Sequence, residues 1–156
     1  MNLDPDFIVP TNGELGNGLV WKLNNDVLTI SGIGAMPNFK WSGMSVSTVE
    51  YTGEVPPWWV HRKNVKKIII EEGITNIGEA SFTHFDNLEE LSISNTVTTI
   101  EDEILTYSTI KEIVLPESVN RIEQTAFSST LKSLEKITIL NKEFVMCLST
   151  PKCTTR

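Results

Sequence analysis

A repeat of 22 to 24 residues runs through the second half of the chain and limits the folds that this sequence can adopt. Four segments, starting at Val65, Leu88, Ile110 and Leu134, align so that apolar residues recur in six columns. The second and third columns lie two residues apart and hold only Ile and Leu, which is typical of a short strand with one buried face. A unit that buries one face must share its core with its neighbours. The repeat therefore predicts a solenoid whose strands form a parallel sheet.

The rest of each unit follows the same spacing. In the first unit, an Ile-x-x-Ile step from Ile74 to Ile77 predicts a second extended piece, and the stretch ending at Phe82 is expected to form about one helical turn. The six columns are Val65, Leu88, Ile110, Leu134; Ile68, Leu91, Ile113, Ile137; Ile70, Ile93, Leu115, Ile139; Ile74, Val97, Val119; Ile77, Ile100, Ile122; and Phe82, Leu105, Phe127.

The 156 residues have the length of one domain, and we expect three parts within it. Residues 1–64 form an N-terminal β cap with an aromatic loop. Residues 65–140 form three full coils and a partial fourth, and residues 141–156 form a C-terminal strand or tail. No capping segment follows the last coil, so we expect a frayed edge there, or contact with another chain through self-association.

The cap contains a predicted hairpin. Apolar residues between Trp21 and Ile30 are interrupted by Asn24-Asn25-Asp26, whose residue types suit a tight turn. We expect this hairpin, with Trp21 and Trp58, to be laid over the first coil and to shield its apolar end from water.

Three motifs carry a family resemblance: the pattern Ile74-x-x-Ile77-Gly78-x-x-Ser81-Phe82, the segment LPESVNRIEQTAF from Leu115, and Leu28-Thr29-Ile30-Ser31-Gly32-x-Gly34-x-Met36. The first two are similar to the repeat of the BspA-like leucine-rich repeats, and the third is similar to the segment that precedes these repeats. The resemblance implies a leucine-rich-repeat solenoid, a right-handed β/α superhelix with a parallel sheet and short helical turns. The second unit departs from the pattern, with Glu101 in place of the Gly, and residues 40–55 look like an insertion.

The charge of the chain excludes two classes of partner. Twenty acidic and 13 basic residues give a net charge of −7, whereas nucleic acids and acidic membrane surfaces require clusters of Lys and Arg. No apolar run approaches the roughly 20 residues needed for membrane insertion. Between Val65 and Phe127 there are 12 acidic and four basic residues, a net −8. This acidity either keeps the repeat soluble or steers a basic partner towards it.

The outward positions of the strands form the first candidate binding surface. If the second and third columns point inward, alternate residues line up across neighbouring strands on the outer face. The three ladders are Lys67, Glu90, Glu112, Lys136; Ile69, Ser92, Val114, Thr138; and Glu71, Ser94, Pro116, Leu140. Glu90 beside Glu112 is a repulsive pair that Lys67 and Lys136 would offset. The alternative is that Ile69 and Val114 occur there because β-branched residues suit strands.

Aromatic residues between positions 39 and 59 form the second candidate. Trp58 belongs to the family-like Pro-Trp step and is expected in the core of the cap. Trp41 and Trp59 are candidates for exposed rings that bind a carbohydrate or a protein.

No catalytic or metal-binding motif is found in the sequence, and no enzymatic activity or cofactor is predicted. His61 and His84 are isolated and are interpreted as surface histidines. Gly32-Ile33-Gly34 lacks the third glycine of a dinucleotide site and is interpreted as a turn. The run Glu101-Asp102-Glu103 lacks the loop pattern of a calcium site and is interpreted as a solvated charge run.

Cys147 and Cys153 either pair across the five residues between them or stay as thiols. No targeting segment is visible near Met1. The family resemblance implies a bacterial cell-surface or secreted protein that recognises or adheres to an extracellular or host protein. Carbohydrate binding and a spacer role within a longer surface protein remain as alternatives.

Overall fold

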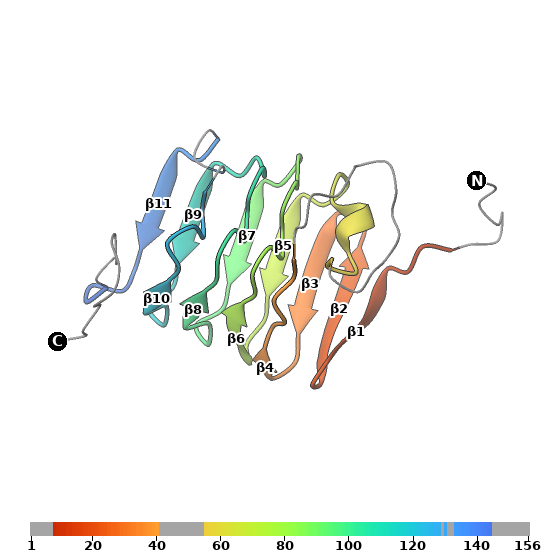
Figure 1. Ribbon diagram of the computed structural model, residues 1–156, viewed down its shortest axis with the longest axis horizontal. Helices are drawn as coiled ribbons and strands as arrows, with labels where there is room; N and C mark the ends of the chain where they lie inside the picture. Colours follow the sequence, from red (N-terminus) through yellow and green to blue (C-terminus); the bar gives the residue numbers. More distant parts are fainter. Residues whose placement is uncertain (1–7, 41–54, 129, 131–132, 145–156) are drawn as a thin grey trace.

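The computed structural model describes residues 8–40, 55–128, 130 and 133–144, which form short strands joined by turns. The strands are β1 (Asn12–Gly16), β2 (Leu19–Asn24), β3 (Val27–Ser31), β4 (Gly34–Ala35), β5 (Lys67–Ile70), β6 (Ile74–Ile77), β7 (Glu90–Ile93), β8 (Thr99–Ile100), β9 (Glu112–Leu115), β10 (Arg121–Ile122) and β11 (Lys136–Ile139). Within these ranges the helical content is one 3₁₀ turn, Trp59–His61. Figure 1 shows β4, β6, β8 and β10 as a second row beside the longer strands. None of the described helices is long and apolar enough to cross a membrane.

The strand pairing confirms the predicted repeat. β5 and β7 pair in parallel, and β9 and β11 pair in parallel with the equivalent register. In the second row, β8 pairs in parallel with both β6 and β10. One turn of the repeat therefore contributes one strand to each row, as expected for a solenoid.

The predicted hairpin is present, but it extends the sheet and is not laid over it. β2 and β3 are antiparallel, with Asn24 opposite Val27 and Asn25 at a positive φ of 55° in the turn. β3 also pairs in parallel with β5, and β4 pairs with β6. The reason is that residues 27–35 repeat the strand–turn–strand pattern of the coils, with a glycine of positive φ in each turn, Gly32 (φ 115°) and Gly73 (φ 103°). The cap segment thus supplies a first set of coil strands.

The inward columns form one core, and the cap contributes its aromatic end. The first five columns are buried in the first two coils, with Ile93 half-buried. Trp58 is fully buried, with its ring centre 6.1 Å from that of Trp21 and 5.8 Å from that of Phe82, and its indole Nε1 donates to the carbonyl of Ser81 at 2.9 Å. Burial of each Ile or Leu contributes about 1.5–3 kcal/mol. Trp21 and Trp58 are therefore buried at the N-terminal end of the core, although the hairpin that carries Trp21 extends the sheet.

The expected helical turn before Phe82 is absent. Residues 79–84 form turns in which Ala80 and His84 have positive φ of 54° and 60°. Their amides bond to the next coil instead of to their own: Phe82 N donates to Ile104 O and His84 N to Thr106 O, both at 2.9 Å. Because these amides donate to the next coil, they cannot form the hydrogen bonds within a single turn that a helix requires.

The predicted continuous sheet is interrupted between the second and third coils. The strand order is β1-β2-β3-β5-β7 in one sheet and β11-β9 in another, so no ladder joins β7 to β9 in the described structure. Figure 1 shows β7 and β9 as successive strands of the same row. We call this unpaired boundary the seam.

Candidate functional site

The outward side chains of β5, β7, β9 and β11 lie as the sequence predicts. On one side of the seam the pairing of β5 with β7 sets Lys67 beside Glu90 and Ile69 beside Ser92, and on the other side the pairing of β9 with β11 sets Glu112 beside Lys136 and Val114 beside Thr138. Five of these side chains are exposed and three are half-buried. We call the eight residues the ladder face.

Ion pairs on and beside the ladder face are exposed. Lys67 Nζ lies 2.8 Å from Glu90 Oε1, while Lys66–Glu89 and Lys111–Glu135 are longer, at 3.9 and 3.5 Å. Such pairs contribute at most about 1 kcal/mol each because water screens them. Among the described residues, Glu112 forms no ion pair, so its carboxylate stays available.

A shallow groove follows the seam. Its volume is about 530 Å³, and it is open to solvent. Its lining consists of Glu89, Glu90, Leu91, Ser92, Ile93, Asn95, Glu112, Val114, Pro116 and Leu140. Carboxylates lie where the strands begin, and apolar residues lie where they end. Sequence reasoning missed this groove, although Glu90 beside Glu112 was a signal for it.

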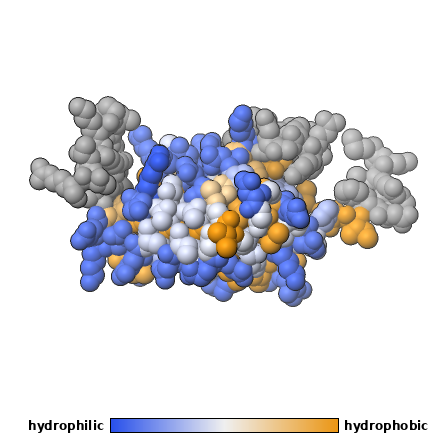
Figure 2. All heavy atoms as spheres, turned by 90° about the horizontal axis from the view of Figure 1, so that it is seen from below, coloured by the Kyte–Doolittle hydropathy of each residue, from blue (hydrophilic) through white to orange (hydrophobic). Residues whose placement is uncertain are grey.

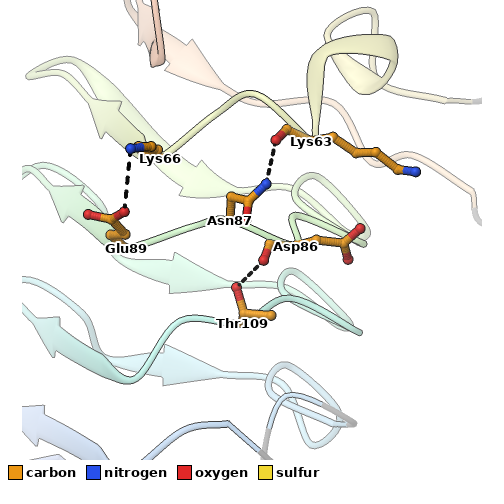
Figure 3. Close-up of polar contacts among 6 residues, drawn as sticks. All are labelled: Lys63, Lys66, Asp86, Asn87, Glu89 and Thr109. Atoms are coloured by element: carbon orange, nitrogen blue, oxygen red, sulfur yellow. Dashed lines mark hydrogen bonds and ion pairs between the residues drawn. The ribbon is translucent and has the colours of Figure 1, made fainter.

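Polar contacts connect the coils just before the strands begin (Figure 3). Asn87 Nδ2 donates to the carbonyl of Lys63 at 2.7 Å, and Thr109 Oγ1 donates to the carbonyl of Asp86 at 2.8 Å. The two contacts are equivalent to each other in successive coils, so these residues order the edge of the ladder face.

The opposite edge of the molecule is mostly hydrophilic. Figure 2 shows it from below, with small separate apolar spots on a polar surface. Ile33, in the turn between β3 and β4, is 84% exposed. Single exposed apolar residues are common on protein surfaces and do not mark an interface.

The prediction of an exposed Trp59 ring is wrong. Trp59 is only 4% exposed, because the guanidinium carbon of Arg62 lies 3.3 Å from its ring centre and His84 packs against its edge. Arg62 is itself buried and donates to the carbonyl of Trp59 at 3.1 Å. A sugar cannot stack on a ring that is covered in this way.

The two histidines are less exposed than predicted. His84 is half-buried between Trp59 and Tyr107, with ring centres 6.4 and 4.9 Å away. Burial lowers the pKa of His84 below its ordinary value, and the charge of Arg62 lowers it further, while Asp86 opposes both. His61 is half-buried, with Nε2 at 2.7 Å from the carbonyl of Pro10. Both histidines therefore take part in packing near the cap.

The acidic run has a structural contact. Asp102 Oδ1 accepts hydrogen bonds from the amide and the hydroxyl of Thr125, at 3.0 and 2.6 Å. This interaction joins the second coil to the third. No group of three or more potential metal ligands is found in the part of the chain that the structure describes.

Trp41, Cys147, Cys153 and most of the predicted C-terminal strand lie outside the described residues. The aromatic candidate site and the state of the cysteines stay as sequence-based expectations.

A profile described as the BspA-type leucine-rich repeat region matches residues 60–146 in six copies, which is more than half of the chain. No curated protein matches it.

Two bacterial crystal structures are similar to the chain. A leucine-rich repeat protein from Eubacterium ventriosum has 24% identity and a TM-score of 0.50, over 85% of this chain and 45% of that one. A leucine-rich cell surface protein from Faecalibacterium prausnitzii has 16% identity and a TM-score of 0.46, over 86% of this chain and 56% of that one. The chain thus spans about half the length of the structures it matches.

Proposed function

The chain belongs to the BspA-type leucine-rich repeat family, and we propose that it is a non-enzymatic recognition module of a bacterial surface or secreted protein. The module binds an extracellular protein through the ladder face. The observation that carries this proposal is the set of exposed side chains held in register across β5 and β7 and across β9 and β11.

The composition of the ladder face suits a protein partner. It mixes charged residues with apolar ones, and Val114 is 49% exposed. The backbone beneath these side chains is fixed by strand pairing, so little conformational entropy is lost when a partner binds. Solenoids of this kind present extended surfaces to their partners.

Binding to a panel of secreted and surface proteins tests the proposal. Val114→Arg and Ile69→Arg should each weaken capture of a bound protein about ten-fold, because they place a bulky charge on the ladder face. Thr75→Arg is the matched control, since Thr75 is exposed on β6 in the other row. Capture that Val114→Arg and Thr75→Arg affect equally would contradict the proposal. Absence of any binding would favour the spacer role.

A further inference from the structure

The end of the seam lacks a backbone hydrogen bond because the residue that would donate it is a proline. In three equivalent places, the residue after a strand donates its amide to the strand before it: Glu71 N to Ile30 O, Ser94 N to Ile70 O and Leu140 N to Leu115 O, at 3.0–3.1 Å. Pro116 occupies this position after β9. Proline has no N–H, so the carbonyl of Ile93 receives no such bond.

The start of the seam lacks its hydrogen bonds as well. The amides of Glu89 and Glu90 both donate to Lys66 O, and those of Glu135 and Lys136 both donate to Lys111 O. No equivalent pair reaches the carbonyl of Glu89 in the described structure. Here two like-charged side chains, Glu90 and Glu112, occupy equivalent positions, and like charges on adjacent strands repel.

The opening is confined to the strand face. Behind it, Ser118 Oγ donates to Val97 O and Thr130 Oγ1 donates to Leu105 O, both at 2.6 Å. β8 and β10 stay paired. The second and third coils are therefore held together on their other sides, and the groove is a fixed feature of this surface.

The open seam presents backbone groups as well as side chains. Because the amides of Glu90 and Ser94 point towards β5, and successive amides of a strand point to opposite sides, those of Leu91 and Ile93 face β9. The groove thus combines backbone groups of Leu91 and Ile93 that belong to no strand ladder with the carboxylates of Glu90 and Glu112.

The charges of the groove select its ligand. Glu89 and Glu90 have lysine partners, whereas Glu112 forms no ion pair among the described residues. At the other end, Val114 and Leu140 are 49% and 45% exposed. A cation near Glu112 and an apolar side chain over Val114 and Leu140 would complement both ends.

We infer that the seam between β7 and β9 is the binding groove of the ladder face, and that its ligand is an extended basic segment of a protein partner. This inference rests on the proposed protein-binding function. A basic side chain of the segment lies near Glu112, and an apolar one packs on Val114 and Leu140.

A synthetic hexapeptide of alternating lysine and valine tests this inference, with a hexapeptide of alternating glutamate and valine as its control. Amide chemical shifts of the intact chain are followed by NMR during titration. The basic peptide should shift amides of residues 90–95 and 112–115, and the acidic peptide should shift none of them. Glu112→Gln should weaken the binding about five-fold or more, whereas Glu71→Gln, which removes an exposed carboxylate outside the groove, should change it less than two-fold.

Equal effects of Glu112→Gln and Glu71→Gln, or shifts spread over all the acidic positions, would overturn the inference. If a protein partner no longer binds Ile69→Arg but still binds Glu112→Gln, the inference about the groove is overturned, while the proposal that the ladder face binds the partner still stands. If the partner still binds both variants, the ladder face is not its binding surface.

Discussion

The two boundaries on either side of β7 occupy equivalent places in the repeat, yet only one of them is closed. Towards β5, Lys67 faces Glu90 with 2.8 Å between their charged atoms, and Ser94 completes the ladder with its amide. Towards β9, the equivalent positions are occupied by two glutamates, Glu90 and Glu112. Pro116 follows β9 at the position that Ser94 occupies after β7. The comparison teaches that two positions at the ends of a strand decide whether a solenoid face is closed or presents a groove.

Putting a proline into the closed boundary should have the largest effect. Ser94→Pro removes the amide that donates to Ile70 O and should lower the free energy of unfolding by about 2–3 kcal/mol. Ser94→Ala is the control, because it removes only the hydroxyl that bonds to Glu71 O and lies 3.0 Å from Thr96 Oγ1. Urea unfolding measures both, and a proline variant no less stable than the alanine variant would contradict the role given to this amide.

The buried contacts behind the two boundaries should be equally strong. Ser108 Oγ donates to Phe82 O at 2.6 Å and accepts from Phe85 N at 3.1 Å across the first and second coils. Thr130 Oγ1 does the equivalent at the next boundary, to Leu105 O. Ser108→Ala and Thr130→Val should each cost about 1–3 kcal/mol in thermal or urea unfolding, since each leaves a buried carbonyl without its donor. If Thr130→Val costs nothing, the second and third coils are separated beyond the strand face.

Exchanging two charges should close the start of the seam. The double variant Glu112→Lys, Lys136→Glu gives alternating signs along the ladder at an unchanged net charge. It should raise the free energy of unfolding by about 0.5 kcal/mol, because one repulsive pair becomes attractive. The gain should disappear in about 1 M salt, where charges are screened within about 3 Å. A gain that persists in high salt would show that the charges are not its cause.

Returning an amide to the end of the seam should alter global stability least. Pro116→Ser allows a hydrogen bond to Ile93 O worth about 1 kcal/mol, while the more flexible unfolded chain offsets about 0.4–1 kcal/mol of it. The expected net change is therefore close to zero, but the new amide should be protected from hydrogen exchange. Pro116→Ala restores the same N–H and should behave alike; an unprotected amide in both variants would contradict the explanation.

Much of the fold could be predicted because it depends on periodic burial. The two apolar columns of the repeat that begin with Ile68 and Ile70 predicted the strands, their register and the ladder face. The Asn24-Asn25-Asp26 turn identified the hairpin. These features follow from local residue types that recur at fixed spacing.

The rest depended on contacts that periodicity does not encode. The turn before Phe82 bonds to the next coil through its amides, so helix-like spacing was misleading. Trp59 is covered by Arg62, only three residues away, and a single aromatic residue carries no sign of its burial. The seam was visible in part, since Glu90 beside Glu112 was recognised as repulsive. The role of the missing donor at Pro116 could not be predicted, because only the structure shows that the equivalent amides of Glu71, Ser94 and Leu140 form hydrogen bonds to the preceding strand.

Hydrogen exchange of single amides in β7, followed by NMR, tests the open seam most directly. Glu90 and Ser92 donate towards β5, while Leu91 and Ile93 face the seam. The amides of Leu91 and Ile93 should exchange about 100-fold faster than that of Ser92, whereas Ile68, Ile69 and Ile70 in β5, which is paired on both sides, should be uniformly protected. Uniform protection along β7 would contradict the open seam and, with it, the groove.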